Sequence, residues 1–157
     1  FYQLPTVFIQ SYIVAFLVIL FVIAFMITKI RGNTFNKKVQ AYSDRHVHKV
    51  LVNYVFNFIA IDVNSQELTY ISPGKQMTFK RNEISDVRIV EKETPGDSES
   101  DGPEEYSVNV LITLQDAQTI KINCVQSAPR GSFLYNSGYN AAQEIEDTIV
   151  KVKNGII

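Results

Sequence analysis

The stretch VFIQSYIVAFLVILFVIAFMIT, from Val7 to Thr28, decides how the rest of this chain is arranged. It contains no charged residue, and every residue from Ile13 to Ile27 is apolar. As an α-helix, its 22 residues span roughly 33 Å, which matches a hydrocarbon core of about 30 Å. A helix pairs its own backbone polar groups, so it can cross lipid. We therefore predict a single transmembrane anchor over residues 1–30.

An apolar N-terminal stretch is also compatible with a cleaved signal peptide or a buried core helix. A signal peptide has a basic segment before its apolar region and a small-residue cleavage site after it, and neither feature precedes Lys29. A core helix is usually shorter, so length favours a retained anchor. Ser11 with Ala15, and Ala24 with Thr28, are small residues four apart that would let a second helix approach closely, although such spacings also arise by chance.

Basic residues dominate the segment that follows the apolar stretch. Only Asp44 opposes them, and they are Lys29, Arg31, Lys37, Lys38, Arg45 and Lys49. The positive-inside rule then predicts an external N-terminus and a cytoplasmic C-terminal domain. The first four of these residues, Lys29, Arg31, Lys37 and Lys38, are the candidates for contact with the membrane surface, because anionic lipid attracts basic side chains.

Residues 31–49 are interpreted as a basic juxtamembrane linker. Gly32 and Asn33 are expected to end the anchor helix, and residues 34–44 then fit a second, short helix. Its apolar residues, at helical spacing on one side, are Phe35, Val39 and Tyr42. Such a helix either lies on an anionic membrane surface or only fixes the topology of the anchor.

From Val50 onward the apolar residues alternate with polar ones, as in antiparallel strands with one buried and one solvated face. In the second of these strands, Leu68 and Tyr70 are expected to face inward, and Thr69 outward. Six strands are predicted, at residues 51–62, 67–71, 76–80, 84–90, 106–114 and 119–124. Residues 115–118 are short enough for a hairpin.

The end of the chain has the pattern of an amphipathic helix. Its apolar stripe consists of Ile145, Ile149, Val152 and Ile156. We expect this helix to begin near Asn140 and to end at Asn154-Gly155. Its stripe would cover the open end of a curled sheet. The predicted fold class is therefore α+β, with one transmembrane helix and a small antiparallel barrel or sandwich capped by a C-terminal helix.

The stretches FIAIDVNSQELTYI (58–71) and MTFKRNEISDVRIVE (77–91) resemble bacterial PH-like (pleckstrin-homology-like) domains. The resemblance covers Val50 to Asn154 and implies a PH-like cytoplasmic domain at residues 50–157, on the inner membrane. Such modules bind lipids, peptides or partner proteins and seldom catalyse. The chain departs from the pattern in showing six strands instead of seven, so one strand is hidden near residues 45–50 or lost. The first turn also carries no basic loop for phosphoinositides.

Acidic residues gather in one segment, residues 91–105, which holds seven acidic residues and one basic residue. Residues 97–102 imitate the start of a calcium loop, but Val108 stands where that motif needs a glutamate. A solvated acidic loop is the favoured interpretation. The single cysteine, Cys124, is predicted to face the core and cannot form an internal disulfide, which fits a reducing compartment.

The chain shows no arrangement of residues typical of catalysis. His46 and His48 lie two apart near Asp44, but a zinc site usually needs three or four ligands, so no metal or other cofactor is predicted. No nucleophile and base have a motif spacing, and the one basic cluster adjoins the membrane, which argues against nucleic acid. We therefore expect a protein that is not an enzyme.

Between the last strand and the last helix, residues 129–140 form a segment that contains Gly and Ser together with aromatic residues. Its candidate partner-binding residues are Arg130, Phe133, Tyr135 and Tyr139. These residues either form an adaptable contact surface for a partner or pack over the core of the domain. The expected function is a non-enzymatic, membrane-anchored interaction module, an accessory or regulatory subunit of a membrane complex. The alternative is a small inner-membrane immunity or exclusion protein that acts against a toxin or a transfer machine.

Overall fold

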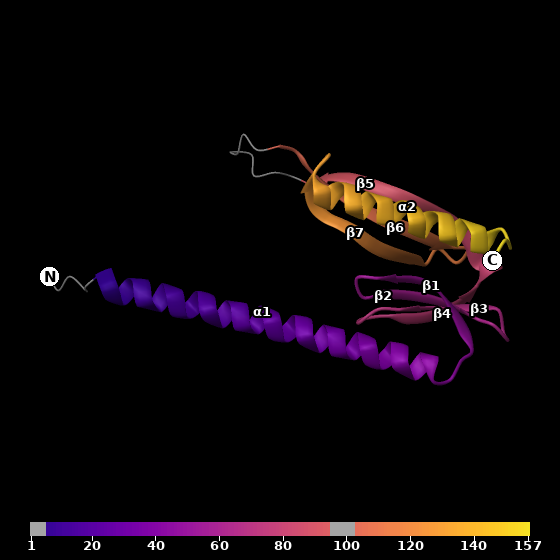
Figure 1. Ribbon diagram of the computed structural model, residues 1–157, viewed down its shortest axis with the longest axis horizontal. Helices are drawn as coiled ribbons and strands as arrows, with labels where there is room; N and C mark the ends of the chain where they lie inside the picture. The colour runs from indigo at the N-terminus through magenta and orange to yellow at the C-terminus, as the bar shows by residue number, and fades with distance from the viewer. Residues whose placement is uncertain (1–5, 95–102) are drawn as a thin grey trace.

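The N-terminal helix is one continuous element. The computed structural model describes residues 6–94 and 103–157, with side chains described from residue 12 onward. Helix α1 (Thr6–Ser43) has 38 residues, is long and apolar enough to cross a membrane, and is not buried along its apolar part (Figure 1). Gly32 and Asn33 do not end it, so the expectation of a separate short helix is wrong. The end of α1 is stabilised by packing against the domain, which overrides the weak helix propensity of this pair.

In the part of the chain that the structure describes, seven strands form two antiparallel sheets. The first sheet has the order β1-β2-β3-β4, with β1 (His48–Tyr54), β2 (Asn57–Asp62), β3 (Glu67–Ile71) and β4 (Gln76–Lys80). The short helix η1 (Arg81–Glu83) leads to the second sheet, ordered β5-β6-β7, with β5 (Ile84–Thr94), β6 (Glu105–Leu114) and β7 (Thr119–Pro129). The predicted turns after β2, β3 and β6 are confirmed.

The strand count differs from the prediction because residues 51–62 are two strands, not one. Val55 and Phe56 adopt positive φ values of 35° and 58° and form a two-residue turn between β1 and β2. Primed turns of this kind suit a hairpin, but their usual residues are Asn and Gly. The turn therefore carries none of the usual sequence signals. Unbroken alternation from Val52 would point Phe58 and Ala60 into the main core, but Ile59 and Ile61 lie there instead.

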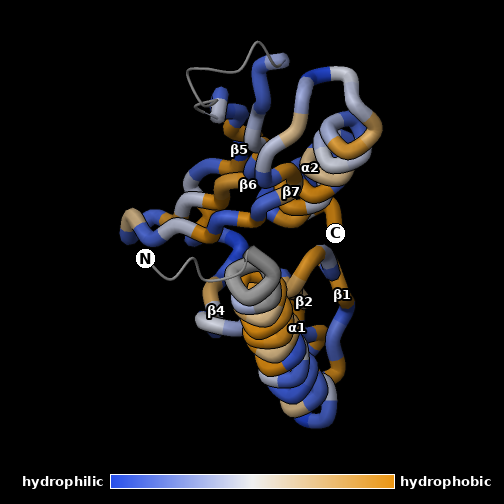
Figure 2. Tube along the Cα trace, turned by 90° about the vertical axis from the view of Figure 1, so that its left-hand side faces the viewer, coloured by the Kyte–Doolittle hydropathy of each residue, from blue (hydrophilic) through white to orange (hydrophobic). Residues whose placement is uncertain are grey.

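One core joins both sheets and α2 (Phe133–Lys153). In Figure 2 the two sheets lie one above the other, with α2 beside β7 and α1 next to the first sheet. The largest fully buried side chains of this core are Ile59, Leu68, Ile112, Ile120, Ile122 and Ile149. Within the described residues no strand pairing joins the two sheets, so they do not close into a barrel. The α+β class is confirmed.

The two central strands of the first sheet, β2 and β3, are buried on both faces. Phe35 and Tyr42 of α1 pack against Phe58, Ala60 and Ile71 on the face turned away from the main core. The expectation of one solvated face is therefore wrong here. Thr69, expected to point into solvent, is only 5% exposed. Because Phe35 and Tyr42 cover this sheet, they do not lie on a membrane surface.

Helix α2 begins seven residues earlier than expected. Ser132 caps it, and the Ser132 hydroxyl accepts a hydrogen bond from the Tyr135 amide. Three residues of the predicted stripe, Ile145, Ile149 and Val152, are buried as expected. Ile156 is not, because it follows the end of the helix and is 71% exposed.

Candidate functional site

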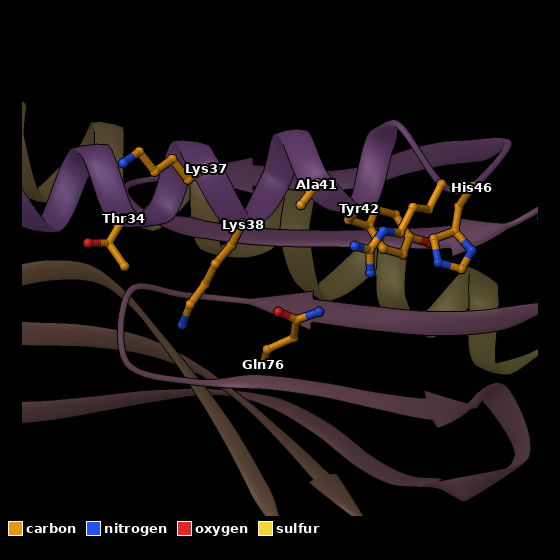
Figure 3. Close-up of a pocket in the computed structure, with 8 residues that line it drawn as sticks. Thr34, Lys37, Lys38, Ala41, Tyr42, His46 and Gln76 are labelled. Atoms are coloured by element: carbon orange, nitrogen blue, oxygen red, sulfur yellow. The ribbon is translucent and has the colours of Figure 1, made fainter.

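A shallow groove of about 370 Å³ lies between the last three turns of α1 and the start of β4. Helical spacing places the α1 residues on one face, since they follow each other at intervals of three or four. We name this site the basic groove, and it is lined by Thr34, Lys37, Lys38, Ala41, Tyr42, Arg45, His46 and Gln76 (Figure 3). Two of its cations, Lys37 and Lys38, are among the residues that the sequence predicts to contact the membrane surface.

The two neighbouring lysines of the basic groove have different roles. Figure 3 shows Lys38 reaching from α1 toward the first sheet, where its Nζ donates to the carbonyls of Pro73 (2.9 Å) and Ser72 (3.3 Å) in the β3–β4 turn. Lys38 is therefore partly occupied in holding α1 to the sheet. Lys37 and Arg45 are exposed and form no ion pair among the described residues. These two side chains are available to an anionic group.

One end of the basic groove is a polar network. Asp62 Oδ1 accepts hydrogen bonds from the amides of Asn64 and Ser65, both 2.8 Å, and Asp62 Oδ2 lies 2.7 Å from His46 Nδ1. The Ser65 amide and His46 lower the pKa of the Asp62 carboxyl from 3.8 to about 2, against a smaller effect of burial. As an ionised carboxylate only accepts, His46 Nδ1 carries the proton and donates it.

Tyr42 forms the wall of this end of the basic groove. Its ring stacks on the His46 ring, with centroids 4.6 Å apart and planes at 20°. The Tyr42 hydroxyl is buried beside Thr69, and burial raises the pKa of Tyr42.

A second cluster lies at the opposite end of the domain, around Glu91 of β5. Glu91 Oε1 accepts from Arg130 through two guanidinium nitrogens, and Oε2 accepts from the Tyr135 hydroxyl at 2.8 Å. Burial opposes ionisation of Glu91, but the hydrogen bonds from Tyr135 and Arg130 outweigh it and hold the pKa below its usual value. The Arg130 guanidinium also lies 4.1 Å from the centroid of the Tyr106 ring.

The four predicted partner-binding residues do not form one exposed surface. Tyr135 and Tyr139 are half-buried, stack on each other at 5.8 Å and pack against the core. Arg130 is exposed but bonded to Glu91, and Phe133 is 84% exposed without such a partner among the described residues. Leu134 beside it is 70% exposed, and sequence reasoning missed it because the segment was interpreted as a loop.

The other predicted residues lie apart from both clusters. Lys29 and Arg31 are exposed on α1 beyond its apolar stretch. Ala15, Ala24 and Thr28 are exposed on the same helix, where the Thr28 hydroxyl donates to the Ala24 carbonyl, while the side chain of Ser11 lies outside the described residues. Contacts of these residues with lipid or a second helix stay predictions.

The acidic segment is described only at its ends. Residues 91–94 belong to β5 and Glu105 begins β6, whereas residues 95–102, including most of the calcium-like stretch, lie outside the described residues.

In the described part of the chain, no group of three or more His, Cys, Asp or Glu side chains is placed to hold a metal ion. His48 Nδ1 faces the His46 carbonyl at 2.9 Å, so the two histidines do not converge. Cys124 is half-buried, and burial raises the pKa of its thiol to about 11, so it is a weak nucleophile.

The two clusters differ in what they leave free. The basic groove presents exposed cations, whereas the charged groups of the Glu91 cluster are bonded to one another. Comparison of the chain with protein-family models, with curated proteins and with solved structures finds no match.

Proposed function

We propose that the chain is a non-enzymatic, membrane-anchored protein-interaction module that serves as an accessory or regulatory subunit of a membrane complex. The observation that carries this proposal is the continuity of α1. The helix runs without a break from its apolar stretch into the domain, where Phe35 and Tyr42 are 7% and 5% exposed. The anchor is thus also a structural part of the domain.

The end of α1 packs against the domain strongly enough to fix the orientation of the domain relative to the helix. Burying an aromatic side chain contributes about 1.5–3 kcal/mol, and two such residues are joined by the Lys38 hydrogen bonds to the β3–β4 turn. A flexible tether only raises local concentration. A rigid helix also sets which face of the domain meets a neighbour in the membrane.

The basic groove is the proposed partner surface. Its exposed cations Lys37 and Arg45 suit an acidic segment of a partner protein. The basic flank of α1 supports a cytoplasmic position for the domain. The PH-like resemblance of residues 50–154 supports a bacterial inner membrane and a binding role.

Rigid presentation is tested by insertions into α1 after Lys29, between the apolar stretch and Phe35. Two inserted alanines rotate the domain by about 200°, whereas four rotate it by only about 40° while moving it farther along the axis. The chain is purified from membranes in mild detergent with whatever binds it. We expect a stoichiometric membrane partner with the parent chain, its loss with two alanines and its retention with four.

The groove is tested in the same assay with Lys37→Glu and Arg45→Glu together, with Lys121→Glu on β7 as a control at an exposed site. Loss of the partner only in the double variant supports the proposal. A parent chain that brings no membrane protein, or a partner that tolerates every variant equally, contradicts it. Capture of a toxin or a transfer component instead would favour the immunity or exclusion alternative.

A further inference from the structure

Two large apolar side chains stand side by side at the start of α2 without cover from the protein. Phe133 is 84% exposed and Leu134 is 70% exposed. They belong to an ordered helical turn, because the Ser132 hydroxyl accepts from the Tyr135 amide and the Ser132 carbonyl accepts from the Asn136 amide at 3.0 Å. Removing each from water would contribute about 1.5–3 kcal/mol. An apolar pair held in this way suggests a contact surface.

The start of α2 lies on the membrane side of the domain. In Figure 1, α2 begins at the end of the domain toward which the N-terminal half of α1 extends, and this end reaches back alongside α1. Figure 2 looks along α1 from that side, and the beginning of α2 faces the viewer. A bilayer around the apolar stretch of α1, which ends at Thr28, would therefore border the start of α2.

Two polar side chains close in sequence to this pair are bonded within the protein, which lowers the cost of bringing them close to lipid. Arg130 is held by Glu91 and by the Tyr106 ring, and Tyr135 donates its hydroxyl to Glu91. The nearby strand ends carry the exposed acidic residues Glu93, Glu104 and Glu105. These charges would be repelled by anionic lipid, so the contact must be apolar in origin.

We propose that Phe133 and Leu134 form a second membrane contact, which inserts into the leaflet where α1 ends and favours zwitterionic over anionic lipid. The inference rests on α1 spanning the membrane, as in the proposed function, but not on any protein partner. Two contacts with one bilayer fix both the tilt of α1 and its rotation, which a single span leaves open. The basic groove would then face a constant direction.

The absence of tryptophan from the sequence makes a direct test simple, since one introduced tryptophan is the only one. The full chain is reconstituted in zwitterionic bilayers that contain lipids brominated near the headgroup end of their acyl chains. Phe133→Trp is the probe. Phe21→Trp in α1 is the positive control, and Val63→Trp, 51% exposed in the β2–β3 turn, is the matched aqueous control.

We expect bromolipids to quench Phe133→Trp and Phe21→Trp but not Val63→Trp, and to quench Phe133→Trp less as the anionic lipid fraction rises. Quenching of Phe21→Trp alone overturns the second contact and leaves the anchor intact. No quenching of either overturns the anchor and the inference together. A blue-shifted but unquenched Phe133→Trp means that protein, of the same or a second copy of the chain, covers the side chain, and it overturns the lipid contact. Quenching that grows with anionic lipid contradicts the apolar origin.

Discussion

Phe35 of α1 meets Phe56 of the β1–β2 turn edge to face, with ring centroids 5.8 Å apart and planes at 74°. The contact joins the helix to a turn with an unusual backbone conformation, since Phe56 has a positive φ of 58°. Gly32 lies under the same ring, and a Cβ there would sit 3.6 Å from it, an ordinary contact. The strained turn is thus held in place by the helix, and the helix end by the turn.

Phe35→Ala should release the end of α1 from the sheet. Truncating a buried Phe costs about 3–5 kcal/mol, and a short helix without tertiary packing is marginal in water. We expect faster hydrogen exchange at residues 34–43 and at the β1–β2 turn, with little change in α2. Asn36→Ala, at the exposed neighbouring position, is the control. Equal exchange in both variants would show that Phe35 does not hold the helix.

The sequence predicts the elements whose pattern is set by burial on one face. The turns after β2, β3 and β6 and the stripe Ile145, Ile149 and Val152 were all predictable, because period and turn chemistry agree there. The continuation of α1 through Gly32 was not. It depends on packing between residues far apart in the chain, which no local signal reports.

The candidate site was less predictable, for two physical reasons. Val55-Phe56 lacks the Asn or Gly that marks a two-residue turn, so the alternation in residues 51–62 seemed to continue, and the second buried face of β2 was missed. The start of α2 was missed because Gly138 lies inside the helix. The cap at Ser132, which lies just before the helix, was the signal that could have located the true start.

Gly138→Ala should destabilise the domain, although the same change in an exposed helix gains about 1 kcal/mol. A Cβ at this position would lie 2.5 Å from the Cys124 carbonyl oxygen and 2.3 Å from Val125 Cγ2, so α2 would have to move away from β7. Overpacking of this kind costs about 1–3 kcal/mol. Ser137→Ala, one residue earlier and exposed, should gain a few tenths of a kcal/mol. Chemical denaturation of both variants measures the difference, and a stabilised Gly138→Ala would contradict the close approach.

Asp62 should make the domain sensitive to acid. Its folded pKa of about 2 lies below the usual 3.8, so its contribution to stability is complete above pH 3.8 and is lost as the pH falls through 2. Asp62→Asn should have a lower free energy of unfolding than the parent at neutral pH, and this difference should narrow between pH 4 and 2. For Asn64→Ala, a neutral change in the same turn, the difference from the parent should stay constant over this range. Thermal unfolding across this range checks both, and a gap for Asp62→Asn that does not vary with pH would exclude the charged network.

Arg130 should lower the pKa of Glu91 within its own domain. Arg130→Ala leaves Glu91 with the Tyr135 hydroxyl alone, so the pKa of Glu91 should rise toward its usual value of 4.5. Arg88→Ala removes a cation that pairs with Asp86 and should leave Glu91 unchanged. Carboxyl chemical shifts followed by pH titration measure the pKa in each variant. If the pKa of Glu91 is unchanged in Arg130→Ala, Arg130 is not held by Glu91 and is available to a partner.

Cys124 should react slowly despite being the only thiol. Burial raises its pKa from 9.0 to about 11, so at pH 8 its thiolate fraction falls by roughly 100-fold. A thiol placed at the exposed position 127 of the same strand, as Ser127→Cys combined with Cys124→Ala, should label with maleimide about 100 times faster. The rate at Cys124 should also keep rising with pH up to about 11, and denaturant should remove the difference between the two thiols. Rapid labelling at Cys124 that levels off below pH 9 would mean that β7 opens to solvent beside α2, and that the contact between Gly138 and Cys124 is not kept in solution.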